Sequence, residues 1–292
     1  METDVKPGKY VLAVSGGVDS VVLFDILRHQ PGVQLVVAHF DHGIRPDSGA
    51  DRLLVQRLAW RYGLPFVFAR GNLGPDASEA TARAARYAFL HQAREEHGAD
   101  AVVTAHHQDD AIETALLNML RGTGPRGLSA LRSTDTVVRP LLHIPKQQLR
   151  DYAEAHGLSW REDGTNQDDR YRRNYLRQHV TPRLTPAKRR KLLRHIAKAH
   201  RLDEKLGRLL EPYVATPELD RGWFIRLPHA VSSEVMALWL RRHNLGTDRA
   251  GIQRLVVFAK TARPGKQADV SATHTLAAGK NNITLAQRAA LR

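Results

Sequence analysis

Short apolar runs alternate with helical patterns through the first half of this 292-residue chain. Strands are expected at 10–14, 35–39, 65–69 and 101–105, with an edge strand at 137–142. Helices are expected at 21–27, 51–62, 78–98 and 112–121, where apolar residues recur at helical spacing. Because this alternation places a helix between successive strands, it predicts an α/β fold: a Rossmann-like parallel sheet with helices on both faces.

The second half of the chain has a different pattern, which predicts a separate domain. A helix is expected from Pro145 to about His156, followed by a polar loop at 165–174. Further helices are expected at 187–210, 232–243 and 248–259, and a strand at 282–286. We therefore place a boundary near Thr185, between an α/β domain (1–184) and a smaller, mainly helical domain (185–292).

The composition excludes several kinds of site. The chain has no cysteine, which removes disulfides, thiolate zinc sites, iron–sulfur clusters and cysteine nucleophiles, and agrees with a reducing cytoplasm. No apolar run approaches the roughly 20 residues that a membrane-spanning helix needs, and residues 1–9 lack the apolar segment of a signal peptide. We expect a cytoplasmic protein with no membrane partner.

The positive charge is concentrated in one stretch. The chain has a net charge of +14, and residues 172–205 contain twelve Lys and Arg against two acids, a local net charge of +10. Such a block binds phosphate backbones through counterion release, so it predicts a polyanionic partner such as RNA. Two alternatives remain open: a merely basic protein, and a membrane surface, for which the block has few large apolar residues.

A glycine-rich string directly follows the first expected strand and begins a helix. It reads Ser15-Gly16-Gly17-Val18-Asp19-Ser20, and we call it the cradle. Two glycines allow close backbone approach to an anion, serine hydroxyls add donors, and a helix N-terminus favours negative charge. The string predicts a phosphate site, although it is no Walker motif because no Gly-Lys-Ser/Thr follows. The alternative is an ordinary turn in which aspartate caps the helix.

The loop after the second expected strand contains His39, Asp41 and His42. In a doubly wound sheet, ligands bind at the carboxyl ends of the strands, so this loop is expected to line a nucleotide pocket. Two histidines and an aspartate could instead bind a metal, but no convincing further ligand is near in the sequence.

Two arginines, Arg83 and Arg86, stand three residues apart on one expected helix face. The planar guanidinium suits phosphate because it can donate two hydrogen bonds together. The alternative is an ordinary solvated helix face.

Paired acids begin the helix after the fourth strand, in the string His106-His107-Gln108-Asp109-Asp110-Ala111-Ile112-Glu113-Thr114. Asp110 and Glu113 are three residues apart and share a face, so they could hold a magnesium ion or receive an ammonium group. His106 is expected either to contact phosphate or to pack. The alternative is simple capping of the helix by Asp109.

These motifs, in this order, resemble those of the tRNA(Ile)-lysidine synthetase family, a branch of the PP-loop ATP pyrophosphatases. The resemblance extends over residues 9–184 and includes Arg121–Gly124, Arg139–Leu142, Glu162–Asn166 and Arg173–Arg177. One departure is Gly164-Thr165, where the family more often has Pro-Ser or Asp-Ser. After Thr185 the resemblance rests only on a basic, helical region.

The resemblance implies an adenine nucleotide α-hydrolase-like fold and a two-step reaction. The oxygen on C2 of cytidine 34, in tRNA(Ile) with a CAU anticodon, attacks the α-phosphorus of ATP, and pyrophosphate leaves. The amine of free L-lysine then attacks C2 and displaces AMP. ATP and Mg²⁺ are thus the expected cofactors, and a homodimer the expected assembly. The alternatives are another PP-loop enzyme acting on RNA and a non-catalytic RNA-binding protein.

The resemblance also implies roles for individual residues. ATP is expected at Ser15, Gly16, Gly17, Val18, Asp19, Ser20, His39, Asp41, His42, Arg83, Arg86 and His106, with the metal at Asp19. Lysine is expected at Asp110 and Glu113, and tRNA at Arg121, Arg173 and Arg177. The basic block, and not the resemblance, adds Arg189, Arg190, Lys191 and Arg194 to the expected tRNA contacts. The expected catalytic residues are Asp19, Asp110, Glu113, Arg173 and Arg177.

Overall fold

The computed structural model describes residues 1, 3–43, 48–71, 78–161 and 172–288. The chain divides into two compact units, residues 1–197 and residues 198–292. Each unit has its own hydrophobic core, and each is described by itself.

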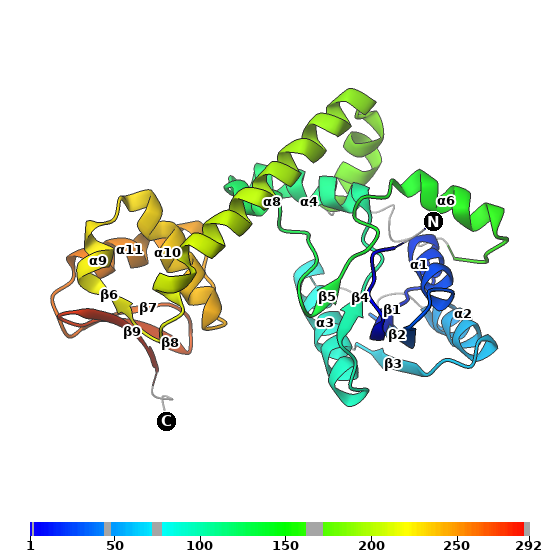
Figure 1. Cartoon of the computed structure of the whole chain (residues 1–292), viewed down its shortest axis with the longest axis horizontal. Helices are drawn as coiled ribbons and strands as arrows, with labels where there is room; N and C mark the ends of the chain where they lie inside the picture. Colours follow the sequence, from blue (N-terminus) through cyan, green and yellow to red (C-terminus); the bar gives the residue numbers. More distant parts are fainter. Residues whose placement is uncertain (2, 44–47, 72–77, 162–171, 289–292) are drawn as a thin grey trace. The chain divides into compact units, whose positions relative to one another are not determined.

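The first unit is built on a five-stranded sheet in which every strand pair is parallel, as the sequence predicts (Figure 1). The strands are β1 (Gly8–Ala13), β2 (Val33–Asp41), β3 (Phe66–Arg70), β4 (Ala101–Val103) and β5 (Val137–Val138), in the order β3-β2-β1-β4-β5. The chain builds outward from β1 through β2 to β3, and then returns to β4 on the other side of β1. This change of direction creates a topological switch point between β1 and β4, where ligands bind in sheets of this kind.

Helices connect the strands and cover the sheet. In chain order they are α1 (Val18–Arg28), α2 (Ser48–Arg61), α3 (Glu79–Glu96), α4 (Gln108–Leu120), α5 (Pro125–Leu128) and α6 (Lys146–Ala155). A short helix α7 (Arg172–Tyr175), a π-helical turn η2 (Leu176–Val180) and a 3-10 turn η3 (Thr181–Arg183) then lead into α8 (Pro186–Val214).

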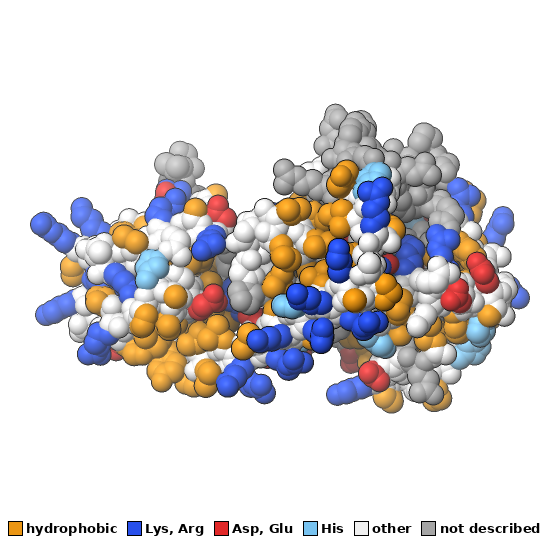
Figure 2. All heavy atoms as spheres, turned by 90° about the horizontal axis from the view of Figure 1, so that it is seen from above, with side chains coloured by type: hydrophobic (Ala, Val, Ile, Leu, Met, Phe, Trp, Pro, Cys, Tyr) orange, Lys and Arg blue, Asp and Glu red, His pale blue; other side chains and the backbone are white. Residues whose placement is uncertain are grey.

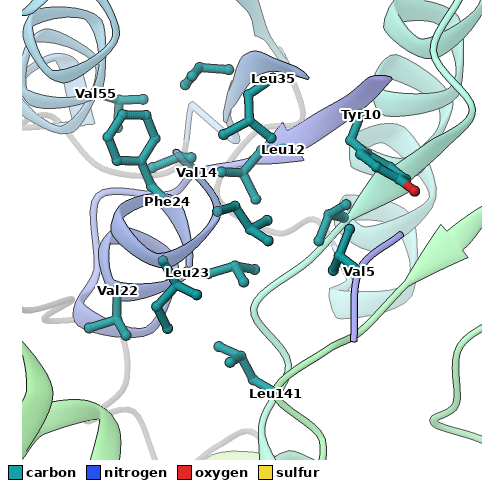
Figure 3. Packing of buried hydrophobic residues seen from close by; sticks show 14 of the residues in the cluster. Val5, Tyr10, Leu12, Val14, Val22, Leu23, Phe24, Leu35, Val55 and Leu141 are labelled. Atoms are coloured by element: carbon teal, nitrogen blue, oxygen red, sulfur yellow. The ribbon is translucent and has the colours of Figure 1, made fainter. Parts of the chain in front are cut away.

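Alternation along the strands explains why both faces of the sheet are covered. Leu12 and Val14 point into a cluster with α1, α2 and α6, in which Phe24 is fully buried (Figure 3). Val11 points to the opposite face and packs with Leu90 of α3. Successive side chains of a strand face opposite sides, so a strand that is apolar at every position must be buried on both.

The second unit combines helices with a small antiparallel sheet. Its helices are α9 (Arg221–Arg226), α10 (His229–Arg242) and α11 (Arg249–Thr261), together with the end of α8. Its strands are β6 (Leu219–Asp220), β7 (Lys266–Asp269), β8 (His274–Ala278) and β9 (Asn282–Gln287), in the order β6-β9-β8-β7. The sequence predicted only the strand at 282–286 and missed β6, β7 and β8. The strand β6 is very short and β7 consists mainly of exposed polar residues, whereas β8 is largely buried.

The expected boundary near Thr185 lies just before α8, whereas the two units divide inside that helix. The first half of α8 belongs to the first unit, where Arg189 forms an ion pair with Asp109. Leu210 and Val214, at its other end, are buried in the core of the second unit. A helix that begins in one unit and ends in the core of the other cannot be assigned to one side by its sequence alone.

Among the described residues, every helix is too short or too polar to span a membrane.

Leu12→Ala should lower the free energy of unfolding by about 2–5 kcal/mol, because Leu12 is fully buried between the sheet and α1 and its loss leaves a cavity. Leu120→Ala is the matched control, since that side chain is 71% exposed, and should change stability by about 0.5 kcal/mol or less. Urea unfolding followed by circular dichroism measures both. Equal effects would contradict the assigned core.

Candidate active site

A cavity of about 380 Å³ lies at the carboxyl ends of β1, β2 and β4. Its walls come from the cradle, from residues 38–42 at the end of β2 and from residues 104–106 after β4. Arg86, Arg161 and Arg177 add positive charge from outside these loops. The cavity therefore lies at the switch point of the sheet and is lined by groups suited to an anionic ligand.

The cradle is held in shape by its own hydroxyl groups. The Ser20 hydroxyl donates to the Gly17 carbonyl at 2.9 Å and accepts from the Ser15 backbone N–H at 3.2 Å. Gly16 has φ +94°, a conformation that side chains rarely adopt, and its carbonyl accepts from Arg161 N–H at 3.0 Å. Gly17 is the N-cap of α1 and makes no side-chain cap, so the helix N-terminus is open toward the cavity.

The two carboxylate oxygens of Asp19 differ in their contacts. Its Oδ2 lies 3.5 Å from His107 Nε2 and 3.4 Å from Lys146 Nζ. Its Oδ1 is buried and has no hydrogen-bond partner among the described residues. Burial acts to raise the pKa of Asp19, but His107 and Lys146 lower it below its ordinary value, so the group is a carboxylate at neutral pH. A buried carboxylate oxygen without a hydrogen-bond partner, such as Asp19 Oδ1, is suited to bind a cation.

The acid pair is buried and is bonded to two arginines. Glu113 is fully buried; it accepts from Arg173 Nε at 3.2 Å and from Arg177 Nε and Nη2 at 3.1 and 3.0 Å. Asp110 accepts from both arginines at 3.3 Å, and its other oxygen accepts from the His107 backbone N–H at 2.9 Å. We call these four residues the ion cluster. The charges in it balance, which is how two carboxylates can be buried together.

The electrostatics of the ion cluster follow from this pairing. Burial acts to raise the pKa of Asp110, but His107, His106 and Arg173 together hold it well below its usual range. Burial lowers the basicity of Arg177, whereas Glu113 and Asp110 raise its pKa above the ordinary value. Asp110 is therefore a carboxylate and Arg177 a guanidinium cation at neutral pH.

The two histidines before α4 have different environments. Burial lowers the pKa of His106 to about 3, so its ring is neutral, and its Nδ1 lies 2.8 Å from the Thr104 hydroxyl. His107 is the N-cap of α4: its Nδ1 accepts from the Asp109 backbone N–H, which leaves Nε2–H to face Asp19. Burial acts to lower the pKa of His107, but hydrogen bonding to Asp19 and the charge of Asp110 raise it.

The last residues of β2 and His42 after it line the same cavity, so the expected loop residues His39 and Asp41 lie within the strand. His39 is buried and donates from Nδ1 to the Val14 carbonyl at 2.8 Å, and burial lowers its pKa. The Asp41 carboxylate accepts from the Gly43 N–H at 2.8 Å, and His42 packs edge-on against Phe40. Across the described ranges, no group of three or more His, Asp or Glu side chains is arranged to hold a metal.

An aromatic ring organises the arginines of α3. The Arg83 and Arg86 guanidinium carbons lie 4.9 and 5.4 Å from the centre of the Tyr87 ring, and Arg139 donates to the Tyr87 hydroxyl at 3.1 Å. Of these arginines only Arg86 lines the cavity, and its buried Nε has no hydrogen-bond partner among the described residues.

The residues fit a nucleoside triphosphate with its metal. The open N-terminus of α1, the unpaired Asp19 Oδ1 and the unpaired Arg86 Nε offer complementary groups to the phosphates and to a divalent cation. A family model of the PP-loop domain matches residues 1–184.

The chain belongs to the PP-loop family. The matching family model is that of an ATP-binding domain, so the chain is an ATP-binding protein.

Curated relatives are longer than this chain. It is 40% identical over 272 residues to the tRNA(Ile)-lysidine synthase of Thermus thermophilus, covering 88% of this chain and 52% of the relative. It is 39% identical over 226 residues to the enzyme of that name from Nitrosomonas europaea, covering 70% of this chain and 48% of the relative. The chain thus spans about half the length of the curated relatives it matches.

A solved structure supports the fold alone. The U34-tRNA thiolase NcsA of Methanococcus maripaludis, with its 4Fe-4S cluster, matches with a TM-score of 0.50 and 17% identity. The match covers 68% of this chain and 73% of that chain.

Several residues expected to act in this PP-loop protein lie outside the cavity walls. The Val18 side chain is buried in the hydrophobic core and does not line the cavity. Arg83 does not line the cavity, and Arg121 is exposed at the end of α4. Arg189 pairs with Asp109, whereas Arg190, Lys191 and Arg194 are exposed on α8. The motif at Glu162–Asn166 falls outside the described residues.

Other PP-loop site residues were not anticipated from the sequence. Arg161 donates from Nε to the Asp51 carboxylate at 2.6 Å, and both line the cavity. The sequence places Lys146 only at the start of a helix, but in the structure its Nζ lies 3.4 Å from Asp19 Oδ2. The one available signal was the position of Lys146 directly after Pro145, at the first turn of a helix. Asp51 and Arg161 carry no such signal, because their pairing spans 110 residues.

Gly16→Ala should destabilise the PP-loop by roughly 1–2 kcal/mol and weaken ATP binding, because a side chain at φ +94° is strained. Gly49→Ala is the matched control, since a Cβ there meets nothing within 4 Å and alanine favours the helix. Thermal unfolding and calorimetric ATP titration measure both. Equal stability and equal ATP affinity of the two variants would contradict a requirement for glycine at position 16.

Proposed function

We propose that the chain carries the catalytic part of a tRNA(Ile)-lysidine synthase. It would use ATP to adenylate C2 of cytidine 34 and then transfer free L-lysine to that carbon, with release of AMP. The observation that carries the proposal is the proximity of the PP-loop to the buried acid pair. His107 Nε2 lies 3.5 Å from both Asp19 and Asp110, and Arg177, which is bonded to Glu113, lines the cavity. The names of the relatives, which extend beyond this chain, support the choice of substrates.

The PP-loop side of the site fits the first step. The hydroxyls of Ser15 and Ser20 and the open N-terminus of α1 would hold the pyrophosphate part of ATP. Mg²⁺, held by Asp19 Oδ1 and the phosphates, would supply charge neutralisation as pyrophosphate leaves. Arg86 and Arg177 line the same cavity and would approach the phosphates, which concentrates positive charge where negative charge develops.

The ion cluster fits the amino acid. Free lysine has a carboxylate and two ammonium groups, and two arginines with two acids offer a complementary charge to each. We propose that the lysine side-chain ammonium binds Asp110 and Glu113 in exchange for guanidinium contacts. The released arginines would then be available to phosphate or to the lysine carboxylate.

One face of α8 fits the RNA. Each residue of an α-helix is rotated by about 100° around the helix axis. Around the axis of α8, seven exposed basic residues fall within a sector of roughly 100°, and no acidic residue of the helix lies in that sector. They are Arg190, Lys191, Arg194, Lys198, Arg201, Lys205 and Arg208, and we call them the basic face. Arg189 lies off this face and pairs with Asp109. Lys and Arg side chains far outnumber acidic ones on the surface that Figure 2 shows.

The membrane alternative fits α8 less well. An interfacial helix needs a free apolar face opposite its charges, but Leu210 and Val214 on that side of α8 are buried within the protein. The exposed apolar residues Leu202, Leu209 and Tyr213 lie beside the basic face and not opposite it. We also propose the cytoplasm as the compartment and a homodimer as the assembly, both from the family resemblance.

Labelled lysine tests the proposed function. The chain should incorporate lysine into unmodified tRNA(Ile) with a CAU anticodon only when ATP is present, and should fail with other tRNAs or amino acids. If pyrophosphate is released in response to tRNA but no lysine is incorporated, another PP-loop activity on RNA is favoured. A thiolation like that named for NcsA is disfavoured because this chain has no cysteine. If neither signal appears, a non-catalytic RNA-binding protein remains.

Glu113→Gln should slow lysine transfer more than adenylation, because it removes one charge from the acid pair and leaves the PP-loop intact. We expect at least a tenfold larger loss in lysine incorporation than in tRNA-dependent pyrophosphate release. Asp19→Ala is the comparison variant and should abolish both steps. Equal loss of the two steps in Glu113→Gln would argue against a lysine-binding role.

Replacing Arg194, Arg201 and Arg208 together by Gln should weaken tRNA binding and reduce its salt dependence by roughly one unit of slope per lost phosphate contact. The matched control replaces three exposed basic residues of the second unit, Arg263, Lys266 and Lys280, by Gln. Filter binding at several salt concentrations measures both. An unchanged slope in the first variant would exclude the basic face from the RNA contact.

A further inference from the structure

We propose that Lys146 is a further ATP-binding residue, whose ammonium contacts the pyrophosphate part of the nucleotide. The inference rests on the ATP-binding half of the proposed function and is independent of lysine and tRNA. Nothing in the motif pattern assigns a role to this residue.

The position of Lys146 is fixed by packing. It is the first residue of α6, and Leu149 and Ala153 of that helix are fully buried against α1. Tyr152 donates from its hydroxyl to Asp25 of α1 at 2.9 Å, which further joins the two helices. Since α1 begins at the PP-loop, this packing holds the start of α6 beside the phosphate site.

The contact of Lys146 with Asp19 shows where its charge lies. Nζ is 3.4 Å from Asp19 Oδ2, longer than the usual 2.7–3.2 Å of an N–H···O hydrogen bond. The side chain is 31% exposed, and its ammonium has three donors, of which Asp19 takes one. The lysine is therefore held loosely, with donors to spare, next to the acid that we assign to the metal.

Binding of ATP would change the partner of Lys146. A triphosphate carries far more negative charge than one carboxylate, and a cation on Asp19 Oδ1 would reduce the attraction of that carboxylate for the lysine. Lysine is well suited to phosphate because it acts as a flexible point charge. We therefore expect the ammonium to move from Asp19 to the β- or γ-phosphate.

Comparing the affinities for ATP and AMP separates a phosphate-binding role of Lys146 from a purely structural one. Lys146→Met should weaken ATP binding, measured by calorimetry, by about 10- to 100-fold, the worth of one hydrogen bond to a charged group. AMP binding should stay within about twofold of the original protein, because AMP lacks the phosphates concerned. Lys146→Arg should restore part of the ATP affinity. Lys6→Met, which removes an exposed lysine from the same unit, is the matched control and should change neither affinity.

Each other outcome overturns the inference. Equal weakening of ATP and AMP would show that Lys146 only supports the fold, and unchanged ATP affinity would show that it makes no contact. A loss that disappears when Mg²⁺ is removed with EDTA would show that it only orients Asp19. Failure of the unaltered protein to bind ATP would overturn the proposed function as well, which distinguishes the two.

Discussion

The burial of Glu113 is the constraint on which the rest of the site depends. A fully buried carboxylate costs several kcal/mol unless it is paired and hydrogen-bonded, and here Arg173 and Arg177 supply both needs. This pairing joins α4 to the segment that begins at α7, with Arg173 lying 60 residues further along the chain than Glu113. Arg177 lies in the π-helical turn η2, a kind of turn that is frequent at functional sites.

Much of the fold could be predicted from the sequence because its strongest signals are local. Residues 10–14 are apolar at every position, so a strand buried on both faces was the natural expectation, and β1 is that strand. The second unit was harder. The strand β7 contains Lys266, Gln267 and Asp269 and is mostly exposed, so no apolar pattern marks it, and only its pairing with β8 makes it a strand.

The candidate site could be predicted where its residues are close in sequence. The cradle and the Asp110–Glu113 spacing each lie within one short string, and their chemistry can be read from that string. The partners of these groups come from distant segments: Arg173 is 60 residues from Glu113, and Lys146 is 127 residues from Asp19. No local pattern indicates such pairs, because they depend on which helices pack against the end of the sheet.

A crystal structure with L-lysine and a non-hydrolysable ATP analogue would test the exchange of partners in the ion cluster most directly. We expect the lysine side-chain nitrogen within about 3 Å of Asp110 or Glu113, with at least one of the two guanidinium groups moved onto the phosphates or the lysine carboxylate. Lysine bound elsewhere, with Arg173 and Arg177 still on Glu113, would contradict the assignment of this acid pair to the amino acid.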